Sequence, residues 1–169
     1  MRPVEFQAKT IAQLLEKVKI ATLAELKKAL GTSVTVTVFR KLRTLAYRTS
    51  YSHRGSYYTL DRIARFNERG LWSVGAVQFS KHGTLLATAE AFVRDSQSGC
   101  FVLDLEEELG VSVQEALLTL NRRGRIVREQ TSGRYLYCSP DLLTRRKQLL
   151  SRRLLEQQVA LGGRAGGGA

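Results

Sequence analysis

The sequence is poor in the residues that build metal sites and disulfides. Its 169 residues include only two cysteines, Cys100 and Cys138, and two histidines, His53 and His82. A structural zinc site takes about four such ligands at short spacings, and this chain has no such pattern. We therefore expect no metal and no cofactor. We also expect both thiols to be free and buried, because a free cysteine behaves as a small hydrophobic residue.

Membrane and enzyme signatures are missing as well. No apolar run approaches the roughly 20 residues that cross a bilayer, and the N-terminal MRPVEFQAKT lacks the apolar core of a signal peptide. No nucleophile–base pair, phosphate-binding glycine loop or acid–base pair of carboxylates can be recognised. These absences favour a cytoplasmic protein that has no membrane partner and is not an enzyme.

Positive charge is abundant and unevenly distributed. The net charge is +12, and 43% of the residues are hydrophobic, which is enough for a packed core. Residues 1–69 carry 14 Lys and Arg against 5 Asp and Glu, residues 70–140 carry 7 against 8, and residues 141–169 carry 6 against 2. The excess at both ends predicts an acidic polymer or surface as a partner.

The first part of the chain contains a long segment without carboxylates. No acidic residue lies between Glu25 and Asp61. The basic residues of this segment are Lys27, Lys28, Arg40, Lys41, Arg43, Arg48 and Arg54. A surface formed by them would not repel phosphate groups.

Local patterns predict several helices and a hairpin in the first half. The predicted elements are helices over residues 4–19, 22–31 and 33–45, a hairpin over 48–60 and a short connecting helix over 61–69. Thr22 and Glu25 form a capping box for the second helix, and Gly31 ends it. The hairpin consists of two runs rich in Thr and Tyr around His53-Arg54-Gly55.

The third of these helices lies in an ambiguous stretch, TSVTVTVFRKLRTLAY at residues 32–47. Its alternating Val and Thr residues are typical of a strand, whereas the following FRKLRTL favours a helix. In a helix, the large apolar residues share one stripe: Val34, Val38, Phe39, Leu42 and Leu45. A strand would leave some of them outside the core. We therefore expect a helix in which context overrides local β-propensity.

The second half repeats the order of the first. It predicts a strand over 71–80, helices over 84–95, 102–109 and 112–123, and a hairpin formed by RIVREQ, a Thr-Ser-Gly turn and RYLYC. A shift of 78 residues lays Leu42 on Leu120 and Gly55 on Gly133. We interpret the two halves as a duplicated unit.

This order of helix, helix, turn, helix and hairpin resembles the winged helix-turn-helix family. The residues that carry the resemblance are Leu23, Leu26, Leu30-Gly31, Leu42, Leu45 and Gly55-Ser56-Tyr57-Tyr58. It covers about residues 10–60, and residues 84–138 more loosely. It implies a mainly α-helical α+β fold with small β-hairpins and two winged-helix units in tandem. The implied domains are a DNA-binding unit with its connecting helix (1–69), a second unit (70–140), a basic C-terminal helix (141–161) and a disordered glycine-rich tail (162–169).

The resemblance also implies a DNA-contacting surface. In such proteins the third helix enters the major groove and the hairpin contacts the backbone. The corresponding residues are Ser33, Val36, Thr37, Arg40, Lys41, Arg43, Thr44, Arg48, His53 and Arg54. Their chemistry is suitable because Arg pairs with guanine edges, hydroxyls donate or accept, and a valine methyl contacts that of thymine.

The second unit carries carboxylates in comparable places. Gln114 and Glu115 occupy early positions of its third helix, and the helix before it contains Asp104 and Glu106–Glu108. We assign this unit to packing, partner contact or auxiliary contacts with phosphates. The residues expected to make these phosphate contacts are Arg122, Arg123, Arg128, Arg134, Arg145 and Arg152.

The C-terminal helix has leucines on one side. These are Leu143, Leu150, Leu154 and Leu161, with Arg145 and Arg152 on the opposite side. Two interpretations remain open. The helix packs on its own domain, or it joins two subunits of a homodimer.

We expect a double-stranded-DNA-binding protein that acts as a sequence-specific transcriptional regulator. One alternative is an accessory or architectural DNA-binding protein of a mobile element or defence system. Another is a tandem winged-helix scaffold for protein interactions. RNA is a further partner to test, because Tyr57 or Tyr58 could stack on a base.

Overall fold

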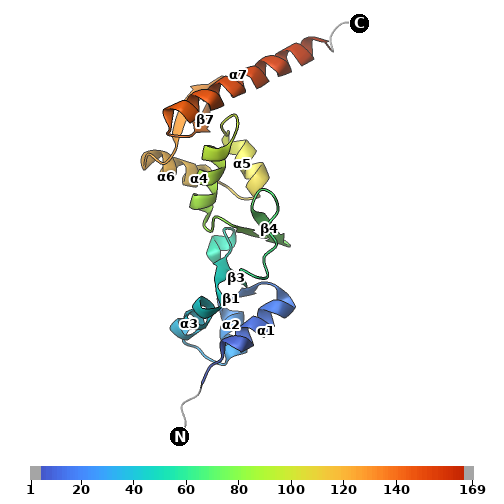
Figure 1. Cartoon of the computed structure of the whole chain (residues 1–169), viewed down its shortest axis with the longest axis vertical. Helices are drawn as coiled ribbons and strands as arrows, with labels where there is room; N and C mark the ends of the chain where they lie inside the picture. Colours follow the sequence, from blue (N-terminus) through green and yellow to red (C-terminus); the bar gives the residue numbers. More distant parts are fainter. Residues whose placement is uncertain (1–4, 166–169) are drawn as a thin grey trace. The chain divides into compact units, whose positions relative to one another are not determined.

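A computed structural model describes residues 5–165 of the chain, with side chains for residues 5–162, and has an α+β fold (Figure 1). Its helices and small antiparallel hairpins form two compact units, Met1–Leu85 and Leu86–Ala169. Residues 71–80 form a hairpin instead of the predicted single strand, and they fall in the first unit, whereas the predicted second domain begins at residue 70. Among the described residues, no helix is long and apolar enough to cross a membrane.

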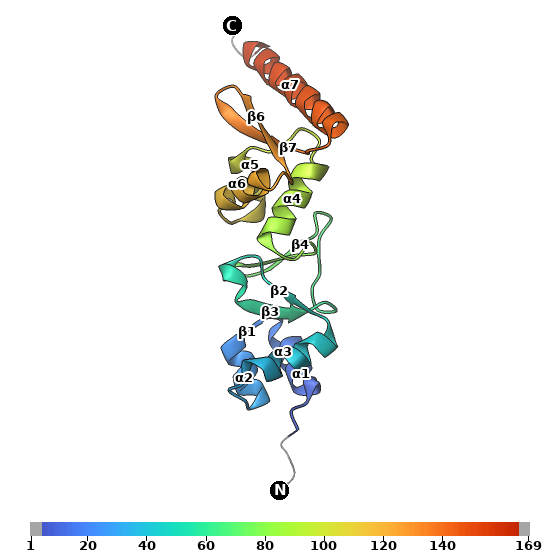
Figure 2. The same ribbon diagram turned by 90° about the vertical axis from the view of Figure 1, so that its left-hand side faces the viewer.

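The first unit combines three helices with two small sheets (Figures 1 and 2). Its elements are α1 (Ala8–Val18), β1 (Ala21–Thr22), α2 (Leu23–Leu30), α3 (Thr35–Leu45), β2 (Tyr47–Thr49), β3 (Tyr57–Leu60), β4 (Leu71–Val74) and β5 (Val77–Ser80). One sheet has the antiparallel order β1-β3-β2, and β4 pairs with β5. A short 3₁₀ turn, His53–Gly55, joins β2 to β3.

The predicted limits of α2 are confirmed. The Thr22 hydroxyl accepts a hydrogen bond from the Glu25 N–H at 3.3 Å, and the Glu25 carboxylate accepts one from the Thr22 N–H at 3.2 Å. Gly31 ends the helix in the left-handed conformation, with φ +81°. All three residues act within one helical turn of a helix end, which is why the sequence alone predicts them.

The ambiguous stretch forms a helix, as predicted. Val38 and Leu42 of α3 are fully buried in the core of the first unit, together with residues of α1, α2 and β3. Phe39 and Leu45 are half-buried beside them. Val34 is the exception to the predicted stripe, because it caps the helix and is 53% exposed.

Residues 61–69 do not form the predicted connecting helix. They form two turns instead. The side-chain oxygen of Asn67 accepts hydrogen bonds from the N–H groups of Arg69 at 2.9 Å and Leu71 at 3.1 Å. An Asn that accepts a hydrogen bond from the backbone two residues ahead competes with helical hydrogen bonding. The chain therefore forms a turn at Asn67 that leads to the start of β4.

The β4–β5 hairpin supports the loop between β2 and β3. The Tyr51 N–H donates to the Gln78 carbonyl at 2.9 Å, and the Gln78 N–H donates to the Ser52 hydroxyl at 2.8 Å. Tyr51 and Ser52 are buried as a result. The loop is therefore fixed to its own unit at its base.

The second unit has a related order of elements. They are α4 (Leu85–Asp95), which begins at the boundary, α5 (Val102–Leu109), α6 (Gln114–Arg122), β6 (Val127–Thr131), β7 (Arg134–Cys138) and α7 (Leu142–Ala165). An isolated bridge, Cys100↔Tyr137, takes the place of the β1–β3 pairing. The turn between β6 and β7 is formed by Ser132 and Gly133, both with positive φ.

Strand pairing places the internal repeat at 79 residues, one more than the sequence comparison indicated. Adding 79 to both members of Ala21↔Tyr58 gives Cys100↔Tyr137, and adding it to Arg48↔Thr59 gives Val127↔Cys138. The shift of 78 aligned the glycines of two turns whose conformations differ. Residues 50–56 form an irregular loop, whereas 129–135 extend the ladder around a two-residue turn.

A buried glutamine anchors α7 to the second unit. The Gln148 side-chain oxygen accepts a hydrogen bond from the Ser139 N–H at 2.8 Å, and its amide donates to the carbonyls of Val93 at 2.8 Å and Ser96 at 2.9 Å. The helix continues to Ala165, so residues 162–165 are helical and not part of a disordered tail. Helix propagation adds one hydrogen bond for each residue fixed, which favours this extension. Residues 166–169 lie outside the described part.

Candidate nucleic-acid interface

The outward side of α3 gathers most of the residues predicted to contact DNA. Val36 is 61% exposed, two residues from the fully buried Val38. The side chains exposed around it belong to Ser33, Arg40, Arg43 and Thr44, and those half-exposed belong to Thr37 and Lys41. Burial of the opposite stripe fixes the rotation of α3 and directs this mixed basic, hydroxyl and methyl surface outward.

The guanidinium groups on this surface have no acidic partner. Among the described residues, neither Arg40 nor Arg43 forms an ion pair or a hydrogen bond through its side chain. The Thr44 hydroxyl donates to the Lys41 carbonyl at 2.7 Å, which leaves its oxygen able to accept. The surface therefore offers cationic donors at its centre and a hydroxyl acceptor at its end.

One carboxylate lies close to this surface. Glu5 lines a shallow hollow of about 480 Å³, whose other lining residues are Phe6, Gln7, Thr37, Arg40 and Lys41. The sequence does not indicate this arrangement, because Glu5 and Arg40 are far apart in the chain. A negative charge on the rim of the hollow that Arg40 also lines opposes the approach of a phosphate.

Arg48 is engaged within its own unit. Its guanidinium forms an ion pair with Asp61, donates to the Lys81 carbonyl at 3.0 Å and lies 4.7 Å from the centre of the Phe66 ring. The neighbouring Tyr47 packs on the core, so Arg48 lies on the other face of the sheet. The structure does not bring this predicted contact to the surface of α3.

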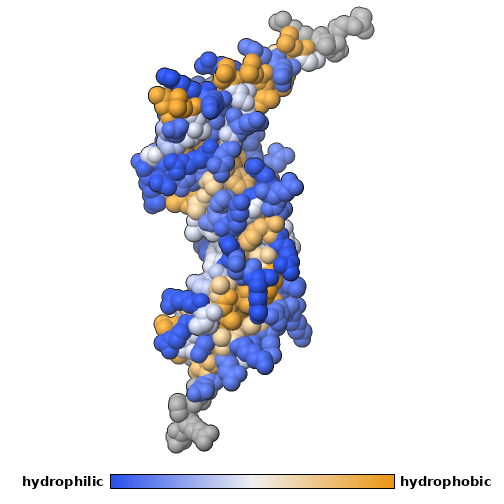
Figure 3. Space-filling view, viewed as in Figure 1, coloured by the Kyte–Doolittle hydropathy of each residue, from blue (hydrophilic) through white to orange (hydrophobic). Residues whose placement is uncertain are grey.

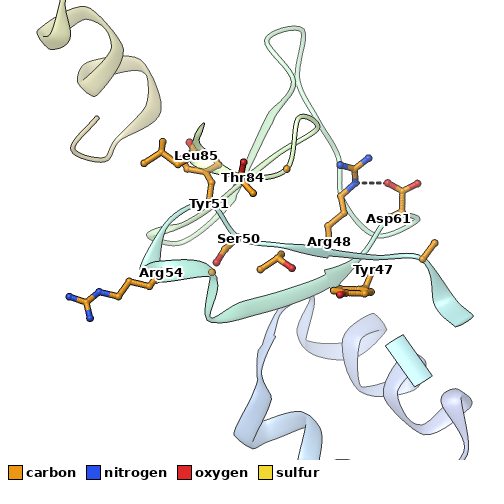
Figure 4. A pocket seen from close by; sticks show the side chains of 12 residues that line it. Tyr47, Arg48, Ser50, Tyr51, Arg54, Asp61, Thr84 and Leu85 are labelled. Carbon is orange, nitrogen blue, oxygen red and sulfur yellow. Dashed lines mark hydrogen bonds and ion pairs between the residues drawn. The ribbon is translucent and has the colours of Figure 1, made fainter. Parts of the chain in front are cut away.

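The loop between β2 and β3 presents a second, separate group. His53 and Arg54 are exposed, with positive φ values of 53° and 54°. The His53 ring packs edge-on against Tyr57 at 5.4 Å. In both views the loop lies away from α3 (Figures 1 and 2). Arg54 points outward from a hollow of about 840 Å³, which has the Arg48–Asp61 pair at its far end (Figure 4).

The arginines of the second unit are partly occupied by internal contacts. Arg152 donates to the carbonyls of Ser98 at 3.0 Å and Gly99 at 2.9 Å. Arg134 stacks on the Phe101 ring at 3.8 Å, and Arg128 on Tyr135 at 4.2 Å. A stacked guanidinium can still donate its N–H groups to a phosphate. Arg152, in contrast, already donates N–H groups to two backbone carbonyls.

The remaining auxiliary residues differ in exposure. Arg122 and Arg123 are exposed at the end of α6, and Arg145 is half-buried on α7. The acidic residues of α5 include one with a clear structural role. The Asp104 carboxylate accepts a hydrogen bond from the Phe101 N–H at 3.1 Å, as Glu25 does for Thr22 at α2.

Other site chemistries find little support in the described residues. No group of three or more His, Cys, Asp or Glu side chains there could hold a metal ion. Burial raises the pKa of Cys100 and of Cys138 to about 11, so both thiols are protonated at neutral pH. No protein-family model, curated protein or solved structure matches the chain.

Proposed function

We propose that this chain is a double-stranded-DNA-binding protein that inserts α3 into the major groove. The observation that carries the proposal is the outward side of α3, where Arg40 and Arg43 lie unpaired beside exposed hydroxyl and methyl groups. A major groove admits one α-helix, and this combination of side chains suits its base edges.

The order of elements supports this proposal. The first unit runs α1, β1, α2, α3, β2, β3, with sheet order β1-β3-β2. This order is similar to that of winged helix-turn-helix proteins. The second unit has the same order and the same pairing register, with a single bridge in place of β1. We therefore propose two winged-helix units in tandem.

The charge distribution supports unequal roles for the two units. Met1–Leu85 contains 15 Lys and Arg against 5 Asp and Glu, a net charge of +10, whereas Leu86–Ala169 contains 12 against 10, a net charge of +2. Neutralisation of DNA phosphates by Lys and Arg supplies nearly all of the affinity that does not depend on base sequence. We assign the primary contact to the first unit and an auxiliary or partner-binding role to the second.

Within the first unit, α3 would provide both orientation and sequence readout. Its first turn has no acidic residue, and its N-terminus carries the positive end of the helix dipole. Arg40 and Arg43, three positions apart, are neighbours on the helix surface. An arginine that reaches a guanine edge discriminates between sequences, whereas one on a phosphate only positions the helix.

Selection of bound sequences from a pool of random duplexes tests the proposal directly. A sharp motif supports a sequence-specific transcriptional regulator, and enrichment without a motif supports an architectural or accessory role. With five or six phosphate contacts, log affinity should fall with log salt concentration at a slope of about −5. No binding at low salt would leave the protein-interaction scaffold as the better explanation.

Three substitutions in the full chain separate α3 from general electrostatics. Arg40→Ala should weaken binding by about 1–3 kcal/mol and relax preference at one base position. Arg65→Ala, which removes an exposed arginine outside α3, should change affinity much less. Glu5→Gln should tighten binding about two- to threefold, because it removes the carboxylate from the hollow that Arg40 also lines. Equal losses for the two arginine variants would contradict the role of α3.

A further inference from the structure

The C-terminal helix α7 packs on its own unit through Gln148, Leu149 and Arg152, and most of its other leucines are exposed. Gln148 is 1% exposed, and the Arg152 side chain is 18% exposed. On the opposite side, Leu143, Leu150 and Leu154 are 67%, 57% and 51% exposed. Figure 3 shows hydrophobic side chains along this helix. A leucine stripe of this extent on a soluble helix indicates an interaction surface.

The outward residues follow the spacing of a coiled-coil seam. They alternate at intervals of four and three: Leu143, Lys147, Leu150, Leu154, Gln157 and Leu161. This is the a/d pattern of two helices that pack knobs into holes. Since α7 is already fixed by Gln148 and Arg152, the seam is held in place before any partner binds.

We infer that α7 pairs with α7 of a second copy in antiparallel orientation. The seam is symmetric about Arg152, because its members lie two, five and nine residues to either side. In an antiparallel pair centred there, Leu150 meets Leu154 and Leu143 meets Leu161 of the second copy. Lys147 meets Gln157, whose amide oxygen can accept from the ammonium group.

A parallel pair is disfavoured by the same residues. It would place Lys147 directly opposite Lys147 of the second copy, in the middle of the apolar seam. A buried pair of like charges is costly. The antiparallel arrangement brings one pair of like charges together, Arg153 of each copy. This pair is exposed, so salt screens its repulsion.

The size of the seam predicts a weak and reversible dimer. Eight leucines at roughly 100 Å² each bury about 800 Å², below the range of about 1,200–2,000 Å² for stable interfaces. The association should therefore occur at micromolar concentrations. It should strengthen with added salt, because salt screens the repulsion between Arg153 of one copy and Arg153 of the other. An acidic partner or an anionic membrane would bind more weakly at high salt.

Sedimentation equilibrium of the full chain without DNA tests the inference. The weight-average mass should rise from 18.9 kDa toward twice that value between about 1 and 200 µM. Leu154→Asp should keep it at the monomer value with an unchanged melting temperature, because Leu154 is exposed. Leu103→Asp is the matched control, since Leu103 is 72% exposed on α5, and should dimerise normally.

Cross-linking of introduced cysteines tests the orientation. A short thiol cross-linker should join two chains of the double variant Lys147→Cys/Gln157→Cys. It should not join two chains of either single variant, because identical positions lie about 15 Å apart along the antiparallel pair. The native thiols are buried and do not compete. A monomeric wild-type chain at 200 µM, or salt-sensitive binding to anionic vesicles that depends on Leu154, would overturn the dimer. Cross-linking of Lys147→Cys alone would overturn the antiparallel pairing.

Discussion

Val36 and Val38 form a matched pair for testing both the helix and its proposed role. They are the same residue type, two positions apart in α3, yet Val36 is 61% exposed and Val38 is fully buried. Val38→Asp loses about 1.5–3 kcal/mol of apolar burial and adds several kcal/mol for an unpaired buried carboxylate. Because a domain is stable by only about 5–15 kcal/mol, this variant should unfold the first unit.

Val36→Asp should leave the same unit folded. The side chain makes no core contact, and Val36 is the second residue of α3, where a carboxylate interacts favourably with the helix dipole by about 0.3–1 kcal/mol. Its effect on DNA should be large. A negative charge about 4 Å from a phosphate costs between about 1 and 4 kcal/mol, depending on the local dielectric. Affinity should therefore fall at least about fivefold.

Thermal melts and fluorescence anisotropy with a labelled duplex measure the two effects separately. Val36→Asn serves as a control, because it removes the methyl groups without adding a charge, and it should lose less affinity than Val36→Asp. If Val36→Asp fails to fold, the rotation of α3 is wrong. If it folds and binds DNA as tightly as the wild type, α3 is not the interface.

Three further predictions concern stability and thiol reactivity. Ala46 ends α3 with φ 57°, so Ala46→Gly should raise the free energy of unfolding by about 0.5–1 kcal/mol in urea melts. Gln148→Ala should lower it by about 2–4 kcal/mol by stranding buried backbone groups, whereas Gln158→Ala on the exposed side should change it little; equal effects would refute the anchoring role. The Cys100 and Cys138 pKa values of about 11 mean that the unfolded chain ionises first as pH rises above 9, so stability should fall there. Alkylation of the folded chain at pH 8 should be slow and should accelerate on unfolding.

The sequence predicted the elements that depend on nearby residues. Thr22, Glu25 and Gly31 lie within one short helix, and their hydrogen bonds follow from their spacing. Helix α3 required a further step, because its β-branched residues favour a strand locally. Only the requirement to place the large apolar residues on one stripe selected the helix, because a strand would turn Phe39 and Leu45 away from Val38 and Leu42. Val38 and Leu42 are fully buried, and Phe39 and Leu45 pack beside them.

The contacts that the sequence did not predict join residues far apart in the chain. Arg48 looked like one more free cation in an acid-free segment, but it bonds Asp61 and the Lys81 carbonyl. Glu5 looked remote from α3 and lines the same hollow as Arg40. Charge counting along a segment does not detect pairing across the fold, and so it overestimated the basic surface at one position and missed an acid at another.

The two repeats differ most in what covers the outer face of their hairpins. In the first unit Arg48 and Thr59 occupy paired positions on this face, and both donate to backbone carbonyls. Their counterparts 79 residues later are Val127 and Cys138, which form an apolar cluster that Leu149 of α7 joins. A polar face needs hydrogen-bond acceptors, which nearby loops supply, whereas an apolar face needs another hydrophobic surface.

This difference explains why a long helix follows only the second repeat. The helix needs few apolar residues to cover the small cluster, and the bonds of Gln148 satisfy backbone groups at its edge. Leu149 is the leucine of α7 that packs on this cluster. Leu143, Leu150, Leu154 and Leu161 lie outside this cluster and are more than half exposed, which leaves their regularly spaced side chains available for the antiparallel pairing that we propose.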